Sequence, residues 1–427
     1  CSALGDLIVT KTEDTADGAC DADCSLREAI LATNAAAGTD RILVPAGHYR
    51  LAIPPSPLSP SAANGDLDVF DDLWIEGDGV DVTILDGDGV DRVLALSAQT
   101  AAGLGTYRWN ALAVRGLTVR GGRPAGGGAG IFNGDARLTL ERVAIRDNIA
   151  LGDNLGPFGW GGGLFNSGLA SIRDAEITGN ASPLAPGSSV LWAKGGGVAN
   201  VYYYGGGARL VIRESLIEGN EADGLGGGGL FDDALAATSV LDSAVRFNHD
   251  GGVYSDGGLL LRRTSVTANS SDAGAGVVVF GPPRIDGIPG SGAVVVDAST
   301  IADNEAAGIA GGLAVANANF GDPNDEVVVT NTTISGNRCG VDATYGSGAD
   351  VYVQARSSGL ESRLSLSNVT IMQSAANPPD ATSVSVSGLD GRPAVLEAAN
   401  TIVAGSCEIR GTASVVSLGR NLETGET

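Results

Sequence analysis

A short unit recurs along this chain of 427 residues. Each copy has an apolar strand that ends in asparagine, a variable stretch, and a glycine cluster that leads into a second apolar strand. The strand-ending asparagines are Asn148, Asn180, Asn220, Asn248, Asn269, Asn304 and Asn337. Self-similarity of this kind is the sequence signature of a solenoid, in which stacked copies bury one another's apolar faces. The repeat therefore favours a solenoid over two or three ordinary globular domains.

The length of the unit indicates which solenoid this is. Successive asparagines lie as few as 21 residues apart, from Asn248 to Asn269. A coil of that size holds two or three short strands, which pair in parallel with their copies about 4.8 Å above and below. We therefore predict an all-β fold, a single-stranded right-handed parallel β-helix. Longer intervals are expected to carry loop insertions, at 181–194, 281–290 and 318–326.

The recurring residues have structural explanations. Asparagine tolerates a left-handed backbone at a strand end, and stacked asparagines form ladders of amide hydrogen bonds. Glycine allows a positive φ at a corner and a close approach between coils, which accounts for the 65 glycines. A calcium-binding nonapeptide repeat would need aspartate at a fixed period, and that period is absent.

The amino-terminal segment reads differently from the rest. Residues 25–35 are predicted to form a helix, with Ser25 as N-cap and Glu28 completing a capping box. The buried stripe is expected to comprise Leu26, Ala29, Ile30 and Thr33. An open solenoid end exposes its core and strand edges, so a terminal cap is required. We assign residues 1–40 to this cap and 41–427 to the β-helix.

The cysteines indicate an oxidising compartment. Cys20 and Cys24 are close enough in sequence for a local disulfide, whereas a zinc site would lack its other ligands. Cys339 and Cys407 are expected at equivalent strand positions with one coil between them. That separation of roughly 9–10 Å is too long for a disulfide. Cys1, followed by small residues, is typical of a lipidated amino terminus.

The sequence "CSLREAI" at Cys24–Ile30 resembles the signature of the CSLREA-domain family of bacterial secreted and surface proteins. The stretches "RILVPAGHYRL" and "NGDLDVFDDLWIEGDG" agree with it, as do the later Gly-Gly-Gly repeats. The resemblance implies a right-handed parallel β-helix with repeats like those of polymorphic outer-membrane proteins. It also implies an extracytoplasmic location, and it says little about activity.

The charge of the chain limits its partners. The formal net charge is −24, which repels nucleic acid and anionic lipid headgroups. No apolar run is long enough to cross a bilayer, so a lipid on Cys1 is the only membrane attachment we expect. Acidic turns offer weak candidates for calcium ligands. These candidates are Asp78, Asp81, Asp86 and Asp88.

Signals for catalysis are weak. The Gly-His-Gly motif of polygalacturonases and the Tyr-Gly-Phe-Asp-Pro-His motif of mannuronan epimerases are both absent. His48 is interpreted as part of the first coils. A carbohydrate-active site needs carboxylates or a base that converge near one repeat position. The weak catalytic candidates are Asp232, Asp233, Arg246, His249 and Asp250.

Aromatic residues near one insertion are candidates for contact with a glycan or a protein partner, because exposed Tyr and Trp stack on sugars and pack at interfaces. They are Trp192, Tyr202, Tyr203 and Tyr204. The alternative is that they pack into the core.

These patterns predict a non-catalytic structural or adhesive protein, secreted or on the outer surface of a bacterium, including as a lipid-anchored subunit of a surface assembly. Its expected partners are other cell-surface proteins or an extracellular polysaccharide. The alternative is a carbohydrate-active enzyme, a polysaccharide lyase or a glycosidase, acting on an extracellular polysaccharide. No cofactor other than calcium is indicated.

Overall fold

The computed structural model describes most of the chain. The described residues are 5–56, 62–97, 99–100, 107–108, 110–152, 159–184, 193–202, 207–223, 226–280, 294–308, 310–316, 327–340, 348–355, 361–377, 382–389 and 391–424. They form two compact units, Cys1–Leu216 and Ile217–Thr427, which we call unit 1 and unit 2. The boundary between a cap at 1–40 and a β-helix at 41–427 stays a prediction.

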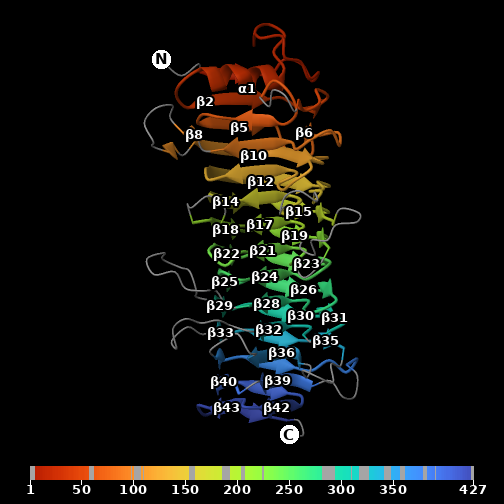
Figure 1. Ribbon diagram of the computed structural model, residues 1–427, viewed down its shortest axis with the longest axis vertical. Helices are drawn as coiled ribbons and strands as arrows, with labels where there is room; N and C mark the ends of the chain where they lie inside the picture. The colour runs from red at the N-terminus through yellow and green to blue at the C-terminus, as the bar shows by residue number, and fades with distance from the viewer. Residues whose placement is uncertain are drawn as a thin grey trace. The chain divides into compact units, whose positions relative to one another are not determined.

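Each unit is built from stacked coils, and each coil carries strands on three faces (Figure 1). One coil of unit 1 runs through β13 (Leu164–Asn166) on face 1, β14 (Leu169–Arg173) on face 2 and β15 (Glu176–Thr178) on face 3. The chain then turns at Asn180 and returns through β16 (Ala181–Ser182) to face 1 of the next coil. The unit recognised in the sequence is therefore one coil.

The strands of unit 1 lie as follows. Face 1 holds β4 (Leu67–Val69), β7 (Leu94–Ser97), β11 (Ile131–Gly134), β13 and β17 (Val198–Asn200). Face 2 holds β1 (Asp6–Ile8), β2 (Asp40–Val44), β5 (Leu73–Gly77), β14, β18 (Arg209–Arg213) and the first halves of β10 (Ala111–Arg120) and β12 (Arg137–Arg146). Face 3 holds β3 (Gly47–Arg50), β6 (Thr83–Asp86), the second halves of β10 and β12, and β15. A separate antiparallel pair joins β8 (Gln99–Thr100) to β9 (Tyr107–Arg108).

Unit 2 repeats the plan. Face 1 holds β21 (Leu230–Asp232), β24 (Val253–Ser255), β28 (Val277–Val279), β32 (Leu313–Ala316), β36 (Gly348–Ala355), β39 (Thr382–Gly388) and β42 (Cys407–Gly411). Face 2 holds β22 (Ala237–Leu241), β25 (Gly258–Arg262), β29 (Val294–Asp297), β33 (Val327–Thr330), β37 (Ser362–Ser367), β40 (Ala394–Ala399) and β43 (Ser414–Ser417). Face 3 holds β23 (Ala244–Arg246), β26 (Ser265–Thr267), β30 (Thr300–Ala302), β34 (Thr333–Ser335), β38 (Thr370–Met372), β41 (Ile402–Ala404) and β44 (Leu422–Glu423), with β19 (Leu216–Glu218) at the unit boundary. Short strands at the asparagine turn are β20 (Glu221–Ala222), β27 (Ser270–Ser271), β31 (Glu305–Ala306) and β35 (Arg338–Cys339).

The pairing between coils is parallel on all three faces, which confirms the predicted parallel β-helix. Register is kept from coil to coil, so equivalent residues stack in rows. One inward row on face 1 of unit 1 consists of fully buried aliphatic residues, Leu67, Leu94, Ile131, Leu164 and Val198. Each such side chain stabilises the fold by roughly 1.5–3 kcal/mol. The core is therefore a stack of Leu, Ile and Val inside the coils.

The predicted asparagine ladder is present in both units. In unit 2 the Nδ2 of Asn248 donates to the Oδ1 of Asn269 at 2.9 Å, and Asn269 donates to Asn304 at the same distance. Asn304 donates to Asn337, and Asn337 donates to the carboxylate of Asp350 at 3.0 Å. These asparagines are buried, so each ladder bond satisfies amide groups that would be costly to bury alone.

We expected the ladder asparagines to have a left-handed backbone, and this prediction is wrong. The positive φ belongs to the residue before each asparagine, for example 57° at Asp147 and 62° at Gly179. The left-handed residue makes the corner, and the asparagine after it points its amide inward. Glycine has its predicted role at the next corner: Gly195 has φ 64°, and a Cβ there would lie 2.3 Å from the oxygen of Val198.

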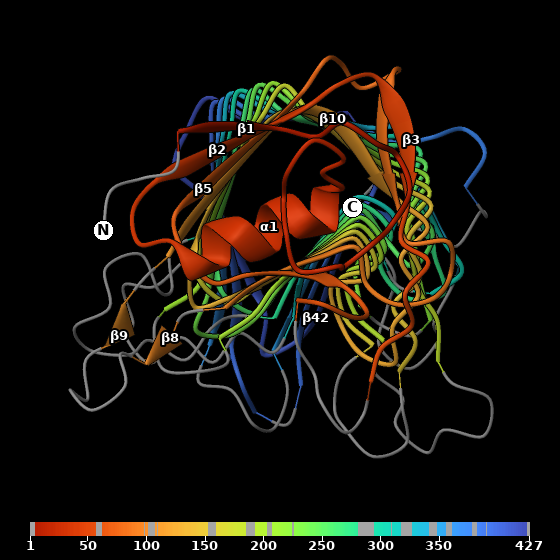
Figure 2. The ribbon, with the colours of Figure 1, turned by 90° about the horizontal axis from the view of Figure 1, so that it is seen from above.

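Helix α1 (Leu26–Ala35) covers the end of unit 1, where Figure 2 shows it lying within the outline of the first strands. Ser25 is its N-cap, and Ser25 and Glu28 form the predicted capping box. The residues that α1 buries include the predicted stripe of Leu26, Ala29, Ile30 and Thr33. Burial alone would raise the pKa of Glu28, but hydrogen bonds from Ser25, Thr15 and Asp17 lower it to about 2.

The cap is tied down by more than the helix. Cys20 and Cys24 form the predicted disulfide. The segment before the helix also supplies β1, which pairs in parallel with β2 and so adds the first strand to face 2. Among the described residues, no helix has the length and hydropathy that a membrane crossing needs.

Arg27 is a fully buried arginine within the CSLREA-like motif. Its Nε lies 2.7 Å from Oδ1 of Asp14, and its Nη2 lies 3.1 Å from the other oxygen of that carboxylate. The guanidinium also donates to the carbonyl oxygens of Ala62 and Gly65. Asp14 in turn accepts from the backbone N–H of Ala52. Arg27 therefore links the helix to three other segments of the first coils.

We expect Arg27→Gln to destabilise unit 1 by about 3–5 kcal/mol, because removing one partner of a buried pair leaves the other charge uncompensated. Denaturant unfolding of the full chain measures this. The control is Arg173→Gln, which breaks an exposed ion pair with Glu214 and should cost no more than about 1 kcal/mol. Equal costs for the two variants would contradict the assigned role of Arg27.

The carboxylate of Asp350, at the end of the ladder in unit 2, should make the stability of the fold depend on pH. Burial raises the pKa of Asp350 from its ordinary 3.8 to about 6. A carboxyl with a raised pKa favours the folded state below its unfolded pKa, and that contribution is lost as the pH rises through the folded pKa. A pKa that differs by one between the folded and unfolded states corresponds to about 1.4 kcal/mol of stability.

Asp350→Asn keeps the ladder acceptor and removes the charge. At about pH 8 the variant should be more stable than the wild type by roughly 2–3 kcal/mol, and at about pH 4 the two should be nearly equal. Denaturant midpoints at both pH values measure the difference. A stability difference that does not change with pH would show that the carboxyl titrates as it does in the unfolded chain.

Candidate functional site

Asp232 lies inside the coil of unit 2 and is fully buried. Its carboxylate accepts hydrogen bonds from Thr238 Oγ1 at 2.6 Å and Ser255 Oγ at 3.2 Å. A catalytic carboxylate has to contact its substrate, so the prediction of a catalytic role for Asp232 is wrong. The reason is the register of the strands, which stacks Asp232 on Ser255 in an inward row of face 1. There its carboxylate accepts the hydrogen bonds of neighbouring buried hydroxyl groups.

The other four catalytic candidates lie in three places in unit 2. Arg246 is on face 3, where it forms an ion pair with Glu218 at 2.9 Å. Asp233 follows β21 in a turn, and His249 is exposed in the turn after the ladder. Asp250 has a positive φ of 65° in that same turn. The structure does not gather these residues with Asp232 into one site.

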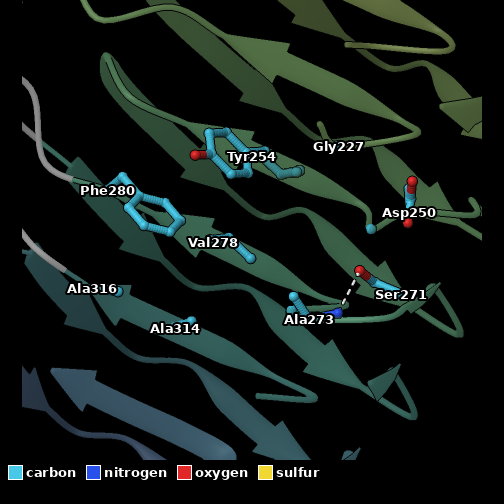
Figure 3. Close-up of a pocket in the computed structure, with 12 residues that line it drawn as sticks. Gly227, Asp250, Tyr254, Ser271, Ala273, Val278, Phe280, Ala314 and Ala316 are labelled. Carbon is cyan, nitrogen blue, oxygen red and sulfur yellow. Dashed lines mark hydrogen bonds between the residues drawn. The ribbon is translucent and has the colours of Figure 1, made fainter. Parts of the chain in front are cut away.

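Asp250 does line a pocket of unit 2, together with Ser271, Tyr254 and Phe280. Figure 3 shows Tyr254 and Phe280 on one side of it, and Asp250 and Ser271 on the other. The Tyr254 ring lies between a tilted Phe231 ring and a stacked Phe280 ring, with centroids 5.6 and 5.2 Å away. The cavity measures about 60 Å³, far below the roughly 300 Å³ at which ligand pockets begin. A sugar ring does not fit.

The predicted calcium ligands do not converge. Asp78, Asp81 and Asp88 are turn residues outside the core, and the Asp78 carboxylate accepts from the backbone N–H of Ala46. Asp86 is nearly buried and holds two side chains that are described below. In the part of the chain that the structure describes, no three His, Cys, Asp or Glu side chains are grouped so as to hold a metal ion.

Several predicted contact residues lie outside the described residues. These are Cys1, Trp192, Tyr203 and Tyr204, with the insertions 281–290 and 318–326. Tyr202 is half-buried after β17. Cys339 and Cys407 form no disulfide with each other, as predicted. Their predicted equivalence is wrong, because Cys339 is in β35 beside the asparagine turn and Cys407 is in β42 on face 1.

One group of chemically active side chains does converge, on face 3 of unit 1. The Nε2 of His48 lies 2.7 Å from Oδ2 of Asp86, and Arg120 donates to that same oxygen at 2.9 Å. Arg120 Nη2 is 3.3 Å from His48 Nε2. We call His48, Asp86 and Arg120 the His48 cluster.

The β-helix builds this cluster from three successive strands, β3, β6 and β10. Tyr49, Leu85 and Val119 stack on one another and point into the core. Side chains alternate along a strand, so the residues beside this row point outward. His48 precedes Tyr49, while Asp86 and Arg120 follow Leu85 and Val119. Parallel pairing in register then brings the three side chains together.

The electrostatics of the cluster keep its carboxylate ionised. Burial alone would raise the pKa of Asp86, but hydrogen bonds from His48, the Asp88 backbone and Arg120 hold it below its usual value. The Asp86 side chain is 10% exposed, whereas those of His48 and Arg120 are each 33% exposed. Asp86 therefore lies beneath two accessible groups and fixes their positions.

This arrangement can transfer a proton. A carboxylate that binds one imidazole nitrogen orients the ring and fixes which nitrogen carries the proton. In the described part of the chain, His48 Nδ1 has no hydrogen-bond partner, so it is available to a ligand. Arg120 adds a fixed positive charge beside the ring. Together these groups form a general base next to a site that favours anions.

Sequence reasoning missed the cluster. It interpreted His48 as part of the first coils and Asp86 as a calcium ligand. A usable signal was present, because "GHYR", "TILD" and "LTVR" end in Arg50, Asp86 and Arg120 and occupy the same place in three coils. The intervening lengths of about 35 residues hide this alignment.

Comparison with known proteins finds solved structures that resemble this chain. No protein-family model matches the chain, and no curated protein sequence matches it either. One similar solved structure is the A-module of the mannuronan C-5 epimerase AlgE6 of Azotobacter vinelandii, at 17% identity and TM-score 0.44, covering 94% of this chain and 96% of that one. The A-module of AlgE4 from the same organism has 14% identity and TM-score 0.43, covering 99% and 100%. The Agl-KA catalytic domain has 12% identity and TM-score 0.41, covering 91% and 63%. Because these TM-scores are below 0.5, the likenesses carry no argument about the activity of this chain.

The lowered pKa of Asp86 predicts how substituting this residue changes stability at different pH values. A carboxylate with a lowered pKa stabilises the fold above its unfolded pKa, and that contribution is lost as the pH falls through the folded pKa. Asp86→Asn should therefore cost about 1–2 kcal/mol near neutral pH, and it should cost less at about pH 2. Denaturant unfolding at the two pH values measures the cost.

The matched control is Asp242→Asn, which weakens an exposed ion pair with Arg263 and should cost less than about 1 kcal/mol. A cost for Asp86→Asn that persists at low pH would mean that the ion pairs of Asp86 are not what stabilises the cluster.

Proposed function

We propose that this chain is a carbohydrate-active enzyme that acts on an extracellular polysaccharide, with the His48 cluster as its catalytic group. The observation that carries the proposal is the partly exposed imidazole of His48 bound to the ionised carboxylate of Asp86, beside Arg120. An ion pair that only stabilises the fold would not need a histidine whose second ring nitrogen is available to a ligand.

The residues of the cluster favour a lyase over a glycosidase. A glycosidase of either stereochemistry generally uses two carboxylates on opposite sides of the scissile bond, and the cluster contains one. In a lyase, His48 Nδ1 takes the proton from the sugar carbon next to a carboxylate. The electron pair left behind forms a carbon–carbon double bond, and the glycosidic oxygen on the neighbouring carbon leaves with its electrons.

Arg120 has a separate part in this reaction. Removing a proton next to a carboxylate places negative charge on that carboxylate in the transition state. Arg120 Nη2 lies 3.3 Å from His48 Nε2, on the side of the ring bound to Asp86, so we place its guanidinium where it neutralises this charge. Asp86 acts through the other two groups and is a positioning residue.

An extracytoplasmic location belongs to the same proposal. The Cys20–Cys24 disulfide supports it, because structural disulfides persist in oxidising compartments. The resemblance of Cys24–Ile30 to the CSLREA signature supports it independently.

The test uses the full chain and a panel of uronate-containing and neutral polysaccharides. Lyase activity releases unsaturated sugar ends, which absorb in the ultraviolet. The wild type should produce them from a uronate polymer, and His48→Gln should lower kcat by at least about a hundredfold. His249→Gln is the matched control, because His249 is the only other histidine of the chain and is exposed in a turn of unit 2.

An unchanged rate in His48→Gln would contradict the assignment of His48 as the general base. Absence of turnover on every polymer would instead favour the second candidate, a structural or adhesive protein. One observation favours that candidate: the last described coil of unit 2 surrounds a hollow of about 490 Å³. Ile409 and Leu422 beside it are each 55% exposed, so an added strand from a partner would cover them.

A further inference from the structure

Three arginines occupy one outward row on face 3 of unit 1. Arg50 pairs in register with Asp86, Asp86 with Arg120, and Arg120 with Arg146. The next residue in the row is Thr178. We call Arg50, Arg120 and Arg146 the arginine row. It passes directly through the His48 cluster.

The two outer members of the row differ from those arginines of this unit that a carboxylate neutralises. On face 2, Arg41 pairs with Glu76 and Arg173 pairs with Glu214. Within the residues that the structure describes, Arg50 and Arg146 form no ion pair, and the buried Nε of Arg146 has no hydrogen-bond partner. Among these residues, no carboxylate lies within ion-pair distance of either guanidinium group.

The stacking of arginines in this row should destabilise the folded state when no ligand is bound. Neighbouring parallel strands are about 4.8 Å apart, so Arg120 and Arg146 hold like charges at close range, and like charges that face one another across strands are destabilising. Asp86 is the only carboxylate in the row, against three guanidinium groups. On a chain with net charge −24, this row concentrates positive charge that bound anions would neutralise.

Guanidinium groups bind carboxylates and phosphates especially well. The planar fork of arginine donates two parallel hydrogen bonds to a carboxylate. The forks of Arg50, Arg120 and Arg146 come from the first, third and fourth coils of the row, so they present anion sites in a line along the stacking direction of the coils. A linear polysaccharide with a carboxylate on successive sugars presents its charges in a line as well.

We propose that the arginine row binds a polyuronate chain that lies along the stacking direction of the coils, with Arg50 and Arg146 holding carboxylates on either side of the His48 cluster. This inference rests on the proposed function and deepens it, because it names the substrate class and the direction in which the chain lies. The two outer arginines hold the flanking sugars, so the sugars between them face His48 and Arg120.

Binding of short uronate oligosaccharides to the full chain tests the proposal, with neutral oligosaccharides of equal length as ligand controls. Arg50→Gln and Arg146→Gln should each weaken uronate binding about tenfold, which corresponds to about 1.4 kcal/mol. The double variant should weaken it further and should reduce the dependence of binding on salt. Neutral oligosaccharides should bind all forms equally weakly.

The matched control is Arg213→Gln. Arg213 is on face 2 of the same unit and also stacks on an arginine, Arg173, so it reproduces the charge change away from the row. It should leave binding unchanged. Unfolding temperatures separate binding from folding: Arg146→Gln relieves repulsion with Arg120, so it should unfold no earlier than the wild type without ligand.

His48→Gln separates this inference from the proposed reaction. It should abolish turnover and keep uronate affinity within about twofold of the wild type. Uronate binding by Arg50→Gln/Arg146→Gln that equals the wild type would overturn the arginine row as the binding site. Equal binding of neutral or sulfated oligosaccharides by the wild type would overturn the assignment to polyuronates.

Discussion

Parallel pairing in constant register is the interaction on which both units depend. It makes the position of a residue within its coil decide what lies above and below it. The same rule stacks Leu on Ile in the core and amide on amide in the ladders. It also stacks Arg120 on Arg146 at the surface. A single geometric constraint therefore places both the residues that stabilise the fold and those that we propose act on a ligand.

The stack needs a defined beginning, because its first coil would otherwise expose apolar side chains and unpaired backbone groups. Helix α1 covers the interior, and β1 pairs with the first strand edge. Arg27 and Asp14 join these parts through a fully buried ion pair. The conspicuous motif at the amino terminus is thus explained residue by residue, from the disulfide at Cys24 to the capping box at Glu28.

Repetition made much of the fold predictable. The asparagines, the glycine clusters, the capping helix and the disulfide each have a local signal, and the structure confirms them. The candidate site was harder, because coils of unequal length hide which residues stack. Asp232 looks catalytic in sequence and occupies an inward row, whereas His48 looks structural and faces outward beside Asp86. Distinguishing them requires the register, which insertions between strands obscure.

The ladder of unit 2 has a direction. Each amide donates toward the next coil, and the series ends at Asp350, a carboxylate that accepts from Asn337 and from Ser383. A copy of a coil inserted anywhere before this point would find a donor behind it and an acceptor ahead. The hydrogen bonding of the ladder would therefore accept an added or removed coil without a new terminator. Its length is free to vary, while its polarity is fixed.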